Sequence, residues 1–62
     1  MNQKTYHIDS QLAFQVAIDN KVLSENPQDS NFAGRYMYMY SQDKHDYFKH
    51  IDTRQYVTNP AN

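Results

Sequence analysis

The chain has 62 residues, with six Lys and Arg against seven Asp and Glu, which gives a formal net charge of −1. This length allows one domain at most, and the charge argues against a dedicated nucleic-acid binder, which usually carries a basic excess. The absence of cysteine excludes disulfides and thiolate zinc sites as sources of stability. Because a domain of this size buries only about 60% of its unfolded surface, we expect oligomerisation or a partner to contribute stability.

The sequence contains no signal for a membrane or for export. No stretch approaches the roughly 18 apolar residues of a membrane helix. The first residues, MNQKTYHIDS, contain no apolar signal core. We therefore expect a cytoplasmic protein that does not contact a membrane.

A short strand and one long helix are predicted at the N-terminal end. Residues 4–8 are β-prone and predict the strand. Asp9 or Ser10 can then accept hydrogen bonds from the first turn of a helix, which we expect over residues 10–24. The apolar residues of this segment also alternate as in a strand, but its length and its start signal favour a helix.

Apolar side chains form two stripes on the predicted helix, with Ala13 and Ala17 between them on one flank. The stripes consist of Leu12, Val16 and Leu23 on one side and of Phe14, Ile18 and Val22 on the other. One stripe can pack on the sheet, which leaves the second for a partner or a twin subunit. We expect a homodimer through Phe14, Ile18 and Val22; the alternative is one broad buried arc in a compact fold.

A loop is predicted over residues 24–34, because Asn26-Pro27 ends the helix and turn-forming residues follow. Phe32 is expected to anchor this loop on the core. Gly34 is the only glycine, and we expect it to supply a positive φ before the next strand.

A β-hairpin is predicted after the loop. Its first strand covers residues 35–40, where aromatic residues alternate strictly. This alternation puts Tyr36, Tyr38 and Tyr40 on one face and Arg35, Met37 and Met39 on the other. We expect the methionine face in the core and the tyrosine face as a half-exposed ladder. Residues 41–46 predict a polar turn and residues 47–51 the return strand, with Phe48 in the core and Tyr47 extending the ladder.

Asp52 is expected to begin a short helical turn over residues 54–57, and residues 58–62 to form a frayed tail. The predicted fold class is therefore α+β. One main helix packs on a small antiparallel sheet that contains a C-terminal β-hairpin, in a single domain spanning residues 1–62.

Catalytic and metal chemistry find little support in the sequence. His7, His45 and His50 each lie near an Asp, but their spacing fits no compact set of metal ligands. The serines fall at predicted caps and turns, and one glycine cannot build a nucleophile elbow or a phosphate loop. We predict no catalytic residue, no metal site and no cofactor, and hence a protein that is not an enzyme.

Binding is the predicted function, because tyrosine supplies contact area at a low entropy cost. The expected partner-binding residues are Tyr36, Tyr38, Tyr40 and Tyr47, with Arg35, Lys49 and Arg54 at the rim. A protein partner is the main prediction. The alternative is single-stranded nucleic acid, whose bases can stack on aromatic residues of a sheet. The tyrosines could also simply fill half-buried positions.

The stretch from Leu23 to Val57 resembles short uncharacterised proteins of bacteriophages and other mobile elements. The residues that carry this resemblance are LSENP, FAGRYMYMY and DYFKHIDTRQYV. Such proteins are often accessory factors. The resemblance therefore implies a small protein that inhibits or modulates a bacterial host or defence protein in the host cytoplasm.

Overall fold

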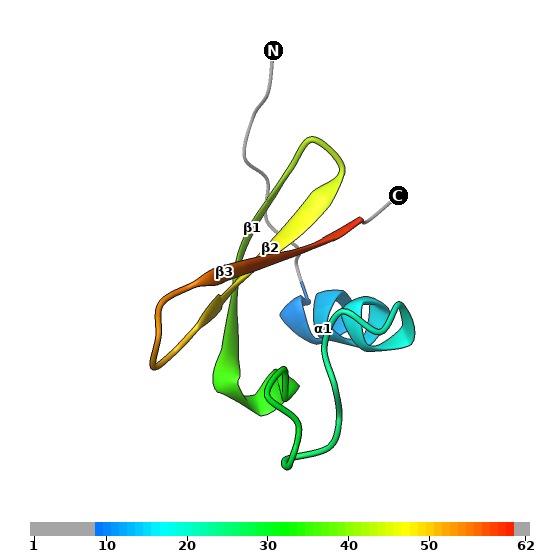
Figure 1. The fold of residues 1–62 in the computed structure, drawn as a ribbon. Helices are drawn as coiled ribbons and strands as arrows, with labels where there is room; N and C mark the ends of the chain where they lie inside the picture. The colour runs from blue at the N-terminus through cyan, green and yellow to red at the C-terminus, as the bar shows by residue number, and fades with distance from the viewer. Residues whose placement is uncertain (1–8, 61–62) are drawn as a thin grey trace.

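The structure, a computed structural model, describes residues 9–60. These form a helix, α1 (Ser10–Asp19), a 3₁₀ helix, η1 (Ala33–Arg35), and three strands, β1 (Tyr36–Gln42), β2 (His45–His50) and β3 (Tyr56–Pro60). The strands pair in the order β1-β2-β3, each antiparallel to the next, and α1 lies to one side of the sheet (Figure 1). The predicted α+β fold class, with its hairpin, is confirmed. The strand predicted over residues 4–8 lies outside the described residues.

Helix α1 begins where the sequence predicts but ends earlier. Asp9 is the N-cap, and its Oδ1 accepts a hydrogen bond from the backbone N–H of Gln11 at 3.0 Å. The helix ends at Asp19 rather than at residue 24, because Lys21 takes a left-handed conformation with φ of 67°. The residues after Asn20 therefore turn back toward the sheet, where Leu23 is buried.

Among residues 9–60 the hydrophobic core centres on Ala13, Ala17, Leu23 and Phe48, each at most 2% exposed. The two alanines allow α1 to approach the sheet closely. The Phe14 ring then packs against the Phe48 ring, with their centroids 4.9 Å apart. The apolar side of α1 is thus one broad arc around the alanines.

A β-bulge in β1 decides which side chains face the helix. Tyr38 is opposite Phe48 and Tyr40 is opposite Tyr47, so Met39 is an extra residue between them. Because directly opposite residues share a face, Tyr38 lies on the helix side with Phe48, whereas Tyr40 lies on the other side with Tyr47.

The predicted assignment of the strand faces is therefore wrong. Tyr36 and Tyr38 pack against the core cluster, whereas Met37 is on the other face and is 46% exposed. The physical reason is the size of the rings. Beneath a helix that presents alanines, Tyr38 fills the space beside Phe48, with ring centroids 5.8 Å apart.

The β1–β2 turn is shorter than the predicted polar turn over residues 41–46. Only Asp43 and Lys44 separate the strands, and their φ values are 55° and 61°. Positive φ at both central residues is the conformation of a type I′ hairpin turn. Ser41 and Asp46 therefore belong to the strands.

The C-terminal residues form a strand, so the helical turn predicted over residues 54–57 is wrong. The β2–β3 connection ends at Arg54, where φ is 65°, and Val57 then pairs opposite Phe48. Residues 58–60, expected in a frayed tail, continue β3. Asn59 is fully buried there, and its Oδ1 accepts a hydrogen bond from Asn20 Nδ2 at 3.0 Å.

Gly34 does not have the positive φ that the sequence predicts. Its role is to leave space for its neighbour, because a Cβ at this position would lie 2.5 Å from Cε2 of Phe32. The loop before it is closed by an isolated bridge between Ser24 and Phe32. The glycine is thus required by the position of the Phe32 ring.

Candidate binding surface

The sheet has one face turned toward α1 and one turned away from it, which we call the open face. Strand register assigns nine residues to the open face: Met37, Tyr40, Gln42, His45, Tyr47, Lys49, Tyr56, Thr58 and Pro60. Tyr56 and Met37 are the most exposed large side chains of this set, at 47% and 46%. The open face thus carries the exposed large hydrophobic side chains of the sheet.

Three tyrosines form a continuous row across the open face, one from each strand. The Tyr40 and Tyr47 rings stack at a centroid distance of 4.8 Å with their planes 25° apart. Tyr47 and Tyr56 meet edge to face at 6.5 Å and 71°. Both geometries are favourable for aromatic pairs, so the row is held in place before any partner arrives.

Lys49 lies next to this tyrosine row. It is on the central strand β2, and its Nζ is 5.7 Å from the centroid of the Tyr56 ring, within the range of a cation–π interaction. Its side chain is half-buried. The methylene stem therefore covers part of the ring while the ammonium remains available.

The structure divides the seven residues predicted to bind a partner. Tyr40, Tyr47 and Lys49 lie together on the open face, whereas Tyr36 and Tyr38 lie on the helix side. The two arginines lie at the end of the sheet near the β2–β3 turn.

Arg35 donates from Nη1 to Asp52 Oδ2 at 3.1 Å, with both side chains largely exposed. Arg54 is exposed in the turn. The prediction missed Tyr56, because residues 54–57 were assigned to a helical turn. The signal that could have found it is the alternation of Tyr56 and Val57 before a Pro, which fits an edge strand.

The side chains on the helix side are occupied within the fold. Ser41 Oγ donates to Asp46 Oδ1, so the hydroxyl of Tyr38, 2.8 Å away, donates to Ser41. Asp46 is only 1% exposed. This chain of hydrogen bonds ties β1 to β2 and does not present a reactive group to solvent.

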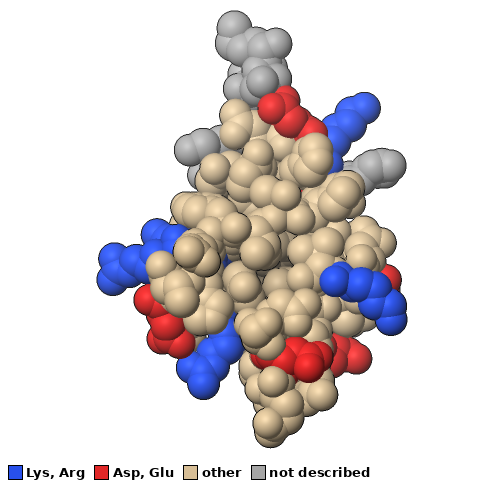
Figure 2. Space-filling model, viewed as in Figure 1, with Lys and Arg blue, Asp and Glu red and all other residues tan. Residues whose placement is uncertain are grey.

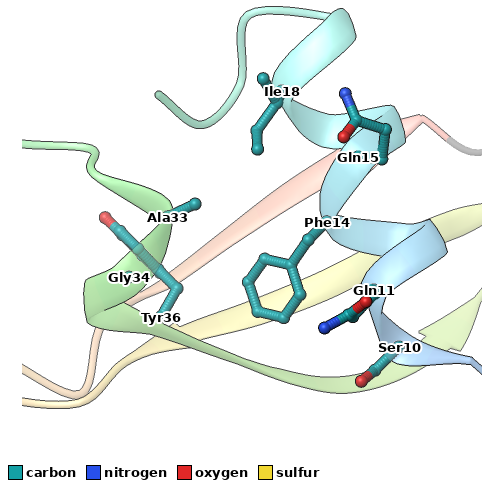
Figure 3. Close-up of a pocket in the computed structure, with 8 residues that line it drawn as sticks. All are labelled: Ser10, Gln11, Phe14, Gln15, Ile18, Ala33, Gly34 and Tyr36. Atoms are coloured by element: carbon teal, nitrogen blue, oxygen red, sulfur yellow. The ribbon is translucent and has the colours of Figure 1, made fainter. Parts of the chain in front are cut away.

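A groove lies between α1 and η1 (Figure 3). It has a volume of about 560 Å³, and the Phe14 ring projects from α1 toward Ala33, Gly34 and Tyr36 on the opposite wall. The lining residues are Ser10, Gln11, Phe14, Gln15, Ile18, Ala33, Gly34 and Tyr36, none of them charged.

The residues expected at a dimer contact lie close to this groove. Phe14, Ile18 and Val22 are all partly buried against the core cluster of their own chain. Phe14 and Ile18 also line the groove. The homodimer stays a prediction.

The histidines of the described chain serve its turns. His50 Nδ1 accepts hydrogen bonds from the backbone N–H groups of Asp52 and Thr53, both at 3.1 Å. His45 Nδ1 lies 2.8 Å from the carbonyl oxygen of Asp43. Within residues 9–60 no three His, Asp or Glu side chains form a group that could hold a metal ion. No helix in the same part of the chain is long and apolar enough to span a bilayer.

Charged side chains surround an uncharged centre on the side of the molecule shown in Figure 2.

Comparison with known proteins adds no family to this description. The chain matches no family model, and neither a curated protein nor a solved structure is significantly similar to it.

Proposed function

We propose that this chain is a small protein-binding module that has no catalytic activity and that contacts its partner with the open face of the sheet. The observation that carries the proposal is the row of Tyr40, Tyr47 and Tyr56 on that face. Tyrosine is enriched in the centres of protein interfaces because its rigid ring covers a large area at a small entropy cost. The exposed Met37 adds a flexible apolar contact at the side of the row.

The packing of the rings favours a protein over single-stranded nucleic acid. Base stacking needs aromatic faces that are open to the ligand. Here Tyr40 and Tyr47 turn a face toward each other, and Lys49 lies over the ring of Tyr56. One face of each ring is therefore in contact with a neighbour, and the tyrosine hydroxyl groups suit hydrogen bonds with protein side chains and backbone carbonyls.

The resemblance to short phage and mobile-element proteins gives this proposal a biological setting. On that basis we propose that the partner is a bacterial host or defence protein, which the module inhibits or modulates in the host cytoplasm. The proposal for the partner rests on the resemblance alone, whereas the proposal for the surface rests on geometry.

The test compares proteins captured from bacterial lysate by three immobilised chains: the natural chain, a Tyr47→Ala/Tyr56→Ala variant and a Leu12→Ala variant. Leu12 is a matched control because it is also an exposed large apolar residue, at 57%, but it lies on α1. We expect a protein that the natural chain and Leu12→Ala retain and that the double variant loses. Thermal unfolding of each variant confirms that it is folded. Identical captured proteins on all three chains would contradict the proposed surface.

Single-stranded nucleic acid is the second candidate, and the absence of any Asp or Glu from the open face favours it. The test measures the anisotropy of a labelled oligo-dT with the natural chain at two salt concentrations. Binding that weakens steeply between about 50 and 200 mM salt and that Tyr47→Ala/Tyr56→Ala abolishes would support this candidate.

A further inference from the structure

The open face differs in charge from the rest of the molecule. All seven carboxylate side chains belong to described residues, and none is on this face. Six lie at the ends of α1, in the loop after it and in the turns of the sheet: Asp9, Asp19, Glu25, Asp29, Asp43 and Asp52. The seventh, Asp46, is buried on the helix side. A chain with a net charge of −1 thus has one sheet face that carries no Asp or Glu side chain.

The lysine of this face is on the central strand β2, near the end that leads to the β2–β3 turn. Lys49 is two residues from Tyr47 on the central strand, and His45 is two residues from Tyr47 in the other direction. Residues spaced by two along a strand are about 7 Å apart. The salt bridge found within residues 9–60 joins Arg35 and Asp52. No Asp or Glu side chain of this part of the chain therefore forms a salt bridge with Lys49.

We propose that the open face binds an acidic protein segment, with a carboxylate of the partner paired to Lys49. This inference rests on the proposed function and specifies the chemistry of its partner. The ammonium of Lys49 lies beside the Tyr56 ring, where a partner carboxylate forms a charge-assisted hydrogen bond, which is stronger than a hydrogen bond between neutral groups. The hydroxyl groups of Tyr47 and Tyr56 can donate to further carboxylate oxygens.

Charge complementarity also discriminates between partners. A basic segment would place its ammonium groups against Lys49 with no carboxylate on this face to receive them, and such a like-charge contact disfavours the wrong partner. Nucleic acid satisfies the charge of Lys49 but has fewer ring faces for base stacking, because Tyr40 and Tyr47 stack on each other and Lys49 lies over Tyr56. An acidic protein segment fits both the charge and the ring packing.

The experiment follows the backbone amide chemical shifts of the full chain by NMR during titration with short blocked peptides. The probes are an alternating Glu-Thr peptide, the matching Gln-Thr and Lys-Thr peptides, and oligo-dT. We expect the Glu-Thr peptide to shift the amides of residues 45–49 and 56–58 and to bind at least about tenfold more tightly than the Gln-Thr peptide. The Lys-Thr peptide should cause no such shifts.

Charge-reversal variants make the assignment specific. Lys49→Glu should abolish binding of the Glu-Thr peptide and create binding of the Lys-Thr peptide. The control Lys21→Glu makes the same change in net charge on the connection after α1 and should leave the preference unchanged. Lys49→Met keeps the apolar stem over Tyr56 and therefore shows the effect of the charge in a folded chain.

Three results would overturn the inference: equal binding of the Glu-Thr and Gln-Thr peptides, shifts confined to α1 and its loop, or stronger binding of oligo-dT than of the Glu-Thr peptide. Each of these results would remove the acidic partner, but the protein-binding surface would still be tested separately by the capture experiment. Suppose that a captured protein requires Tyr47 and Tyr56 but binds the Lys49→Glu variant unchanged. This result would support the open face as the binding surface and contradict the proposal that the partner segment is acidic.

Discussion

Gly34 illustrates how a single residue in this protein is determined by its neighbour. Its backbone is in a conformation open to other residues, since φ is not positive. What excludes a side chain is the Phe32 ring, 2.5 Å from the position of an added Cβ. A rule that assigns glycine to left-handed turns therefore identifies the right residue here for the wrong physical reason.

Gly34→Ala should destabilise the fold by about 1–3 kcal/mol, because the methyl group must displace the Phe32 ring. The measurement is urea unfolding of Gly34→Ala, of Phe32→Leu and of the double variant. The alanine should cost less in the Phe32→Leu background, since the conflicting ring is gone. An equal cost in both backgrounds would show that the backbone, and not the ring, requires glycine.

The hydroxyl group of a tyrosine contributes differently to stability on the two faces of the sheet. Tyr38→Phe removes the donor to Ser41 and should destabilise the chain by about 1 kcal/mol, with partner binding unchanged. Tyr47→Phe, on the open face, should leave the free energy of unfolding nearly unchanged. Thermal unfolding of the two variants checks this contrast, and equal destabilisation would contradict it.

At the scale of elements, the β1–β2 turn contains a feature that ordinary hairpin sequences avoid. Asp43 and Lys44 both have positive φ without glycine, and type I′ turns strongly prefer Asn-Gly at these positions. The hairpin therefore forms in spite of its turn residues. The paired strands, and above all the contact of Tyr38 with Phe48, provide its stability.

Replacing Asp43-Lys44 by Asn-Gly should stabilise the fold by about 0.5–1 kcal/mol, because glycine removes the left-handed strain at a smaller entropic cost. The urea midpoint measures the gain. Asp43→Asn/Lys44→Ala is the control, since it removes the same two charges but keeps a Cβ at positive φ at residue 44. A gain of the same size in this control would mean that charge, and not backbone strain, limits this turn.

The sequence predicted the elements whose signals are local and missed those that depend on distant contacts. The cap at Asp9 and the aromatic run of β1 identified a helix start and a strand. The end of α1 and the strand β3 could not be found in this way, because Asn59 is buried through a contact with Asn20. Two of the three tyrosines in the row, Tyr40 and Tyr47, were named from the sequence, whereas Tyr56 required β3.

For the whole molecule, the number of fully buried apolar side chains is the main limit on stability. A typical stability per residue corresponds to roughly 3–9 kcal/mol for a chain of this length. Phe48 is the largest of the buried core residues and contacts both Phe14 and Tyr38. This side chain is therefore a central contact between the helix and the sheet.

Phe48→Ala should cost about 3–5 kcal/mol, which is comparable to the whole free energy of unfolding, and should leave much of the chain unfolded. Circular dichroism during thermal unfolding is the measurement. Leu12→Ala, at a residue that is 57% exposed, should change stability by no more than about 0.5 kcal/mol. Cooperative unfolding of Phe48→Ala near the natural midpoint would show that the fold does not depend on this contact.

The bulge at Met39 has a consequence for variants of different length. Since Met39 is the additional residue between two regular pairs, its deletion restores an uninterrupted ladder in which Tyr38 still faces α1 and Tyr40 still faces outward. A chain shortened by this one residue should therefore fold and keep the tyrosine row. Deletion of a residue within β2, by contrast, would exchange the side chains of the two faces. We therefore expect the sheet to tolerate a one-residue deletion at Met39. A related sequence with a gap at this position would keep the same side chains on each face of the sheet.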